Sequence, residues 1–145
     1  MNALYPKFLV FLQFTLAGIM IVFSNGFFTN TYALSIFIMG ACVGAWALNH
    51  NKLGNFNIQP KHKDGSYLVT TGIYTYIRHP MYTSVVFMMF AFFIATPTWI
   101  EGLAFLTLIL VLVLKANREE EALITIHADY EAYKAKSKYF IPYIL

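Results

Sequence analysis

Charged side chains are scarce in this sequence. Only 12% of its 145 residues are Asp, Glu, Lys or Arg, whereas 59% are hydrophobic and 18% are aromatic. The mean hydropathy is +0.59. A soluble domain of this length could not bury that much apolar surface, so the scarcity of charge excludes an ordinary soluble protein. The composition indicates an integral membrane protein.

The sequence also lacks the motifs of several other classes. With a single cysteine, Cys42, there is no disulfide framework and no cysteine-rich metal site, and we expect Cys42 to be a small packing residue. The four histidines lack the spacing of metal ligands, so no metal is expected. No G-x-G-x-x-G motif follows a strand, which excludes the soluble dinucleotide-type cofactor fold. Nucleic acid is not an expected partner, because membrane topology explains the basic residues better.

Four apolar runs are long enough, or nearly long enough, to cross a membrane. They cover residues 4–23, 31–48, 81–94 and 98–114, and a spanning helix needs about 20 apolar residues. We predict an all-α, polytopic transmembrane helix bundle of about four spans, forming a single integral membrane domain over residues 1–145. Residues 1–49 would be a two-span hairpin. The second run has small residues at spacings that favour close helix packing, namely Gly40, Ala41, Gly44, Ala45 and Ala47.

The basic residues predict the orientation of this bundle. With four spans, all ten Lys and Arg fall on one side of the membrane, and Glu101 is the acidic residue on the other side. Short cytoplasmic loops are enriched in Lys and Arg, so both termini and residues 52–78 should be cytoplasmic, in a bacterial inner membrane or the endoplasmic reticulum. The polar stretch and the C-terminal tail would then share one face, where an aqueous site could form and where membrane lipids with anionic headgroups could bind.

Residues 68–82, LVTTGIYTYIRHPMY, form a polar and aromatic stretch that runs directly into the third apolar run. Proline is favoured at the first helical position, so Pro80 predicts that a helix begins there. The free N–H groups of that first turn lie at the positive end of the helix dipole and form a potential anion site. The alternative is an ordinary juxtamembrane loop that ends at the proline.

The charged tail predicts that the fourth helix continues beyond residue 114. Positions at spacings of three and four would then share one face, namely Lys115, Glu119, Leu123, Ile126, Tyr130 and Tyr133. A charge on such a face is costly unless it is paired. Glu119 should therefore either pair with Lys115 or contact Arg78 or a ligand. Glu120 and Glu121 would point elsewhere and be solvated.

Several motifs occur here in a characteristic order. They are Gly72-Ile-Tyr74, Arg78-His-Pro-Met-Tyr82, Glu119-Glu120 with Leu123, then Tyr130, Tyr133 and Ile141-Pro142. Beside transmembrane runs, this series resembles the isoprenylcysteine carboxyl methyltransferase family and its phospholipid methyltransferase relatives. Those are integral membrane enzymes that use S-adenosylmethionine. The resemblance covers roughly residues 55–145, although the interval from Leu123 to Tyr130 is one residue shorter than the family pattern.

The resemblance implies that residues 50–145 are the catalytic part, with S-adenosylmethionine as cofactor and S-adenosylhomocysteine as product. Carried over residue by residue, the cofactor contacts are Gln59, Ser66, Tyr67, Leu68, Val69, Tyr74, His79, Pro80, Met81, Tyr82 and Glu119. A basic residue, Lys115 or Arg118, would orient the carboxylate of the substrate. The cytoplasmic loop and an amphipathic C-terminal helix would form the cofactor site.

The resemblance also implies a lipophilic acceptor that enters from the bilayer, with the carboxylate of a C-terminal isoprenylcysteine as first choice. A carboxylate is already ionised at neutral pH, so its methylation needs positioning and desolvation rather than a general base. A phospholipid or small-molecule amine or thiol is the alternative acceptor, and a protonated amine would need a base. A non-catalytic membrane scaffold or transporter subunit is the alternative outside enzymes, but it predicts polar residues along a pathway. The four runs contain few, chiefly Gln13 and Glu101.

Overall fold

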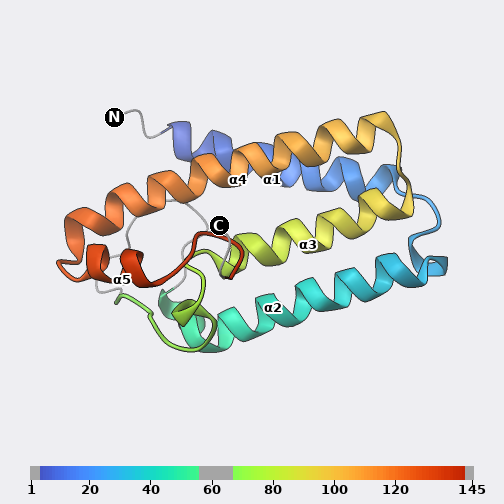
Figure 1. The fold of residues 1–145 in the computed structure, drawn as a ribbon. Helices are drawn as coiled ribbons and strands as arrows, with labels where there is room; N and C mark the ends of the chain where they lie inside the picture. Colours follow the sequence, from blue (N-terminus) through green and yellow to red (C-terminus); the bar gives the residue numbers. More distant parts are fainter. Residues whose placement is uncertain (1–3, 56–66, 143–145) are drawn as a thin grey trace.

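The structure is a computed structural model that describes residues 4–55 and 67–142, with the backbone alone described at 52–55. Within these ranges the elements are helical and no strand occurs. The long helices are α1 (Leu4–Phe23), α2 (Thr31–Asn55), α3 (Pro80–Ala95) and α4 (Trp99–Ile126), and a short helix α5 (Tyr130–Lys136) follows. They form the bundle seen in Figure 1. The prediction of an all-α membrane bundle is confirmed.

The four long helices differ in how well their lengths suit a membrane. Three of them are long and apolar enough to cross it, namely α1, the part of α2 over Thr31–Asn51, and α4. Helix α3 has only 16 residues, or roughly 24 Å at 1.5 Å per residue, against a hydrocarbon core of about 30 Å. It is shorter than a full span, so the prediction of four membrane crossings stays a prediction. The fourth run is not short, because α4 continues for 28 residues.

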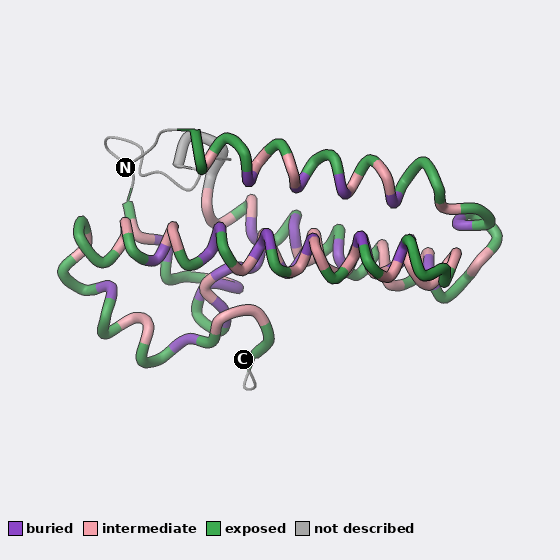
Figure 2. The backbone as a smooth tube through the Cα atoms, turned by 90° about the horizontal axis from the view of Figure 1, so that it is seen from above, coloured by how far each residue is buried: buried purple, intermediate pink, exposed green. Residues whose placement is uncertain are grey.

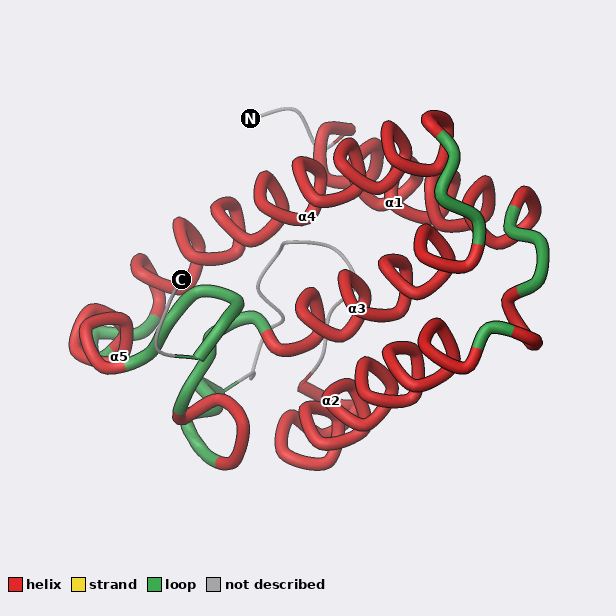
Figure 3. The backbone as a smooth tube through the Cα atoms, turned by 45° about the vertical axis from the view of Figure 1, so that its right-hand side comes forward, coloured by secondary structure: helices red, strands yellow, loops and turns green. Residues whose placement is uncertain are grey.

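The two ends of the bundle are built differently. One end holds two tight turns, which are joined by the backbone N–H of Asn25 donating to Thr96 Oγ1 at 2.7 Å. The other end holds the start of α1, the end of α2, the loop before α3, and α5 (Figures 1 and 3). The polar stretch and the tail thus meet at one end, as the charge pattern predicts. The cytoplasmic location of that end stays a prediction.

Glycines let α2 and α3 approach each other closely. A Cβ built on Gly44 would lie 2.6 Å from Ser84 Oγ, and one on Gly40 would lie 2.9 Å from Phe87 Cβ. Ser84 Oγ donates to the Gly40 carbonyl at 2.7 Å, a bond that needs this approach. The predicted packing stripe is thus right for the two glycines and for Ala47, which is fully buried. It is wrong for Ala41 and Ala45, which lie on the outer face of α2 and are exposed. Cys42, predicted separately as a small packing residue, is exposed as well.

Burial along the bundle alternates with the helical repeat. In Figure 2, buried and exposed residues alternate along the long helices. The exposed sides of α1 and α4 carry large apolar residues, including Phe8, Phe11, Leu103, Leu106 and Leu110. Such surfaces are suited to contact with lipid.

The tail does not continue as one helix, which corrects the predicted face from Lys115 to Tyr133. Helix α4 ends at Ile126, His127 is extended with φ −113° and ψ 108°, and α5 begins at Tyr130. The chain then turns back and pairs with the loop before α3. Lys138 N–H donates to the Tyr76 carbonyl at 2.8 Å, and Arg78 N–H donates to the Lys138 carbonyl at 2.8 Å. A straight helix could not make these contacts.

Candidate functional site

An open pocket lies where the loop before α3 meets α2 and α4. Its lining residues are Asn51, Tyr74, Arg78, His79, Pro80, Met81, Tyr82 and Glu119. Six of these eight are residues that the family resemblance gives as cofactor contacts.

Two features of the local sequence shape the wall of the pocket. Gly72 has φ +61°, and a side chain there would overlap the His50 ring of α2. This glycine opens the 3₁₀ turn η2 (Gly72–Thr75), in which Tyr74 is buried with 7% exposure. Burial raises the pKa of Tyr74, so its phenol is neutral at physiological pH. Helix α3 then begins at Pro80, with His79 as its N-cap residue, as predicted.

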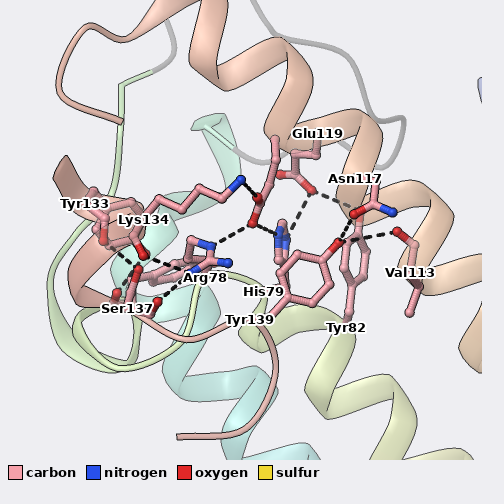
Figure 4. A network of polar contacts seen from close by, with 12 residues as sticks. Arg78, His79, Tyr82, Val113, Asn117, Glu119, Tyr133, Lys134, Ser137 and Tyr139 are labelled. Carbon is pink, nitrogen blue, oxygen red and sulfur yellow. Dashed lines mark hydrogen bonds and ion pairs between the residues drawn. The ribbon is translucent and has the colours of Figure 1, made fainter. Parts of the chain in front are cut away.

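Glu120 is the centre of an ion cluster beside the pocket. Its partners Arg78, His79 and Lys134 are labelled in Figure 4. Its carboxylate accepts from Arg78 Nε at 2.7 Å, and Lys134 Nζ lies 2.9 Å away. His79 Nε2 lies 3.1 Å from the same Oε1 atom that Arg78 contacts. Arg78 also donates to the carbonyls of Lys134 and Ser137. These four residues, Arg78, His79, Glu120 and Lys134, are called the Glu120 cluster below.

The burial of Glu120 corrects the prediction that it is solvated. Its side chain is only 7% exposed, whereas that of Glu121 is 65% exposed. The prediction failed because it placed Tyr130 and Tyr133 on the same helix as Glu119 and thus chose the wrong buried side. In the structure, the side of α4 that carries Glu120 faces the returning C-terminal segment and its cations. Glu121 is solvated as predicted.

Glu119 faces the pocket and is half exposed, with 42% of its side chain accessible. Its Oε2 atom accepts from the Tyr82 hydroxyl at 3.1 Å and lies 3.8 Å from His79 Nδ1. Neither of its predicted protein partners bonds to it. Arg78 bonds to Glu120, and Lys115 bonds to Gln13. The carboxylate therefore keeps accessible surface at the pocket.

Aromatic rings hold His79 in place between the two carboxylates. The Tyr82 ring stacks on it at 5.6 Å between centroids and 15° between planes, and the Tyr139 ring meets it edge-on at 4.9 Å. The Tyr139 hydroxyl donates to Asn117 Oδ1 of α4 at 2.6 Å. Burial raises the pKa of Tyr139 to about 12, so this donor keeps its proton at neutral pH. The C-terminal segment is thereby fixed to the wall of the pocket.

The two candidates for orienting a substrate carboxylate lie in different places. Lys115 is buried with 2% exposure, and its Nζ atom donates to Gln13 Oε1 of α1 at 2.5 Å. That Nζ atom also lies 5.3 Å from the centre of the Tyr82 ring, which lines the pocket. Arg118 instead pairs with Glu121 at 3.1 Å and covers the Tyr5 ring. Proximity to the pocket favours Lys115.

The remaining predicted cofactor contacts either lie away from the pocket or fall outside the described residues. Val69 is buried against the η2 turn, while Tyr67 is 51% exposed and Leu68 half-buried. These three do not line the pocket. Gln59 and Ser66 lie outside the described residues.

Two pocket residues, Asn51 and Arg78, were not among the predicted cofactor contacts. Arg78 adjoins His79 in the recognised motif, which was an available signal. No comparable signal marks Asn51, which lies in the polar end of α2. For metals, no group of three or more His, Cys, Asp or Glu that could hold an ion occurs within residues 4–55 and 67–142.

Fold and pocket together define a helical membrane protein with a pocket of polar and aromatic side chains at one end of its bundle. The model of the isoprenylcysteine carboxyl methyltransferase family matches residues 31–125, well over half of the chain. The chain belongs to this family, which confirms the resemblance, and it is accordingly a membrane methyltransferase. No curated protein matches it. The matched region includes α2, α3 and most of α4, while α1 and α5 lie outside it.

Proposed function

We propose that this protein transfers a methyl group from S-adenosylmethionine to the carboxylate of a lipophilic acceptor such as a C-terminal isoprenylcysteine. The observation that carries the proposal is the pocket. Its lining gathers residues from α2, η2, α3 and α4, and six of them are the cofactor contacts implied by the family motifs. Segments far apart in the sequence thus converge on one pocket.

The residues of the pocket suit the chemical groups of this cofactor. Glu119 has accessible carboxylate surface for an ammonium or a ribose diol. Tyr74 and Tyr82 offer aromatic faces against which an adenine could pack. The first turn of α3, at Pro80 and Met81, has the polarity that favours a carboxylate. When bound, S-adenosylmethionine would supply an activated methyl group on its sulfonium.

Lys115 is our candidate for holding the acceptor carboxylate. Its buried ammonium lies against the face of Tyr82, on the side of that ring toward α1 and α4. A carboxylate held there would need no base, because it is ionised at neutral pH. A protonated amine would be repelled by the same ammonium, which disfavours the amine alternative. The apolar outer sides of α1 and α4 would let a lipid tail remain in the bilayer.

The test is a methyl-transfer assay on the purified protein with labelled S-adenosylmethionine and three acceptors. They are a farnesylated cysteine with a free carboxylate, a phospholipid amine, and a short hydrophilic acid. We expect transfer to the farnesylated carboxylate to be far faster than to the other two acceptors, and saturable binding of S-adenosylhomocysteine by calorimetry. Preferred transfer to the amine would replace the acceptor proposed here, while absence of cofactor binding would refute the methyl donor.

A further inference from the structure

Lys115 has an unusual environment for a buried cation. Lysine is almost never fully buried unless it is paired, and breaking a buried pair is strongly destabilising. Here the hydrogen-bond partner of the 2% exposed Lys115 is the neutral amide of Gln13, at 2.5 Å. The nearest carboxylate along α4, Glu119, accepts from Tyr82 instead. Among the described residues the ammonium therefore has no carboxylate in ion-pair contact.

Gln13 has an equally unusual position. It is 8% exposed and lies within α1, an apolar helix that otherwise buries Leu9, Leu16 and Met20. A buried amide needs hydrogen-bond partners, and its carbonyl finds one in Lys115 across the bundle. Helix α1 lies outside the region that the family model matches. The motifs thus give Gln13 no role, although it is one of the rare polar residues of the apolar runs.

The two residues connect α1 to the pocket. Lys115 Nζ lies over the Tyr82 ring, and the Tyr82 hydroxyl donates to the pocket carboxylate of Glu119. Because a lysine has four rotatable bonds, a fixed acceptor such as the Gln13 carbonyl is what sets the position of its ammonium. Without that acceptor the side chain would be free to turn toward Glu119 and neutralise it.

We propose that Gln13 is a positioning residue, which holds the Lys115 ammonium toward α1 so that it meets the anionic group of the acceptor. This inference rests on the proposed function, and it adds α1 to the acceptor site. The neutral amide fixes the cation without cancelling its charge, which a carboxylate at position 13 would do. The acceptor is defined by its chemistry, as an apolar chain that ends in a carboxylate.

The test compares two probes that differ only in charge: S-farnesyl-N-acetylcysteine and its carboxamide. Their binding to the full-length protein is titrated for wild type, Gln13→Met, Lys115→Met and the double variant. Gln13→Met should weaken the acid by about tenfold, the value of one hydrogen bond to a charged group, and leave the carboxamide unchanged. In the Lys115→Met background, adding Gln13→Met should have no further effect on the acid. Leu16→Met, a buried change of similar volume on the same helix, is the matched control.

Gln13→Glu gives a second reading should Gln13→Met fold poorly. It keeps a partner for Lys115 but adds a competing negative charge, so it too should weaken the acid and spare the carboxamide. Equal losses for both probes would mean that Gln13 serves packing only, and unchanged affinity for the acid would also overturn the inference. So would a wild-type protein that binds acid and carboxamide equally. Failure of the proposed function is seen separately in the same samples, as absence of S-adenosylhomocysteine binding and of methyl transfer.

Discussion

Replacing either of two neighbouring glutamates on α4 by glutamine should impair a different property of the protein. Glu120→Gln removes a charge that is 7% exposed and contacts Arg78 and Lys134 at 2.7 and 2.9 Å. Glu119→Gln removes one that is 42% exposed and faces the pocket. We expect the Glu120 variant to lose stability and the Glu119 variant to lose cofactor affinity. The perturbation is the same in both, loss of one negative charge with the size of the side chain kept.

The magnitudes follow from burial. Removing one member of a buried ion pair costs about 3–5 kcal/mol. Since Lys134 is 39% exposed and can turn to water, the lower end applies, about 3 kcal/mol. That corresponds to roughly 6–12 °C in melting temperature for a chain of this size. For Glu119→Gln, the loss of a charge-assisted hydrogen bond to the cofactor is about 1.5–3 kcal/mol, or on the order of ten- to a hundredfold in affinity.

The assay pairs thermal unfolding in detergent with titration of S-adenosylhomocysteine into each purified variant. Glu121→Gln is the control, because the Glu121 side chain is 65% exposed and pairs with Arg118 at the surface. Glu121→Gln should change the melting temperature and the affinity for S-adenosylhomocysteine little, since exposed ion pairs contribute about 0–1 kcal/mol. Equal cofactor affinity for the Glu119 and Glu121 variants would refute the assignment of Glu119 to the site. A Glu120 variant as stable as wild type would refute the energetic account of the cluster.

Three further predictions concern packing, topology and acceptor. Gly44→Ala should lower the free energy of unfolding by about 1–3 kcal/mol, because the new Cβ would lie 2.6 Å from Ser84 Oγ. Gly18→Ala is the control: a Cβ there has nothing within 4 Å, so this variant should be neutral or slightly stabilising. Thermal unfolding of the two variants compares them. Cysteines introduced at Lys61 and Lys138 should react with a membrane-impermeant reagent from the cytoplasmic side only, and labelling from opposite sides would refute an even number of crossings. A short hydrophilic acid should be methylated far more slowly than a prenylated one, and equal rates would exclude entry from the bilayer.

Much of the fold could be predicted because the apolar runs and one proline mark the helix boundaries locally. Helix α1 spans Leu4–Phe23, the same residues as the first run, and α3 begins at Pro80 as its first-turn preference predicts. The extension of α4 beyond residue 114 also follows from helical spacing. These features depend on each segment's own composition. Few long-range contacts are needed to specify them.

The break between α4 and α5 could not be predicted from local sequence. Residues 115–138 contain no glycine or proline, and their helical spacing is uninterrupted. The break depends instead on contacts with residues far along the chain. Arg78 donates to the carbonyls of Lys134 and Ser137, and the Tyr133 hydroxyl donates to the Tyr74 carbonyl at 2.7 Å. Because spacing along one helix carries no information about such partners, the buried side of α4 was assigned to the wrong glutamate.

Adjacent positions on a helix differ by about 100° in direction, so two consecutive glutamates can serve two different neighbours. At the end of this bundle the pocket lies on one side of α4 and the returning C-terminal segment lies on another. Glu119 meets Tyr82 at the pocket, while Glu120 meets Arg78 and Lys134 on the other side. His79 lies near both carboxylates, at 3.8 and 3.1 Å. The Glu120 cluster therefore fixes the His79 ring, which also lies beside Glu119 at the pocket. Through this ring, the position of the C-terminal segment is coupled to the geometry of the pocket.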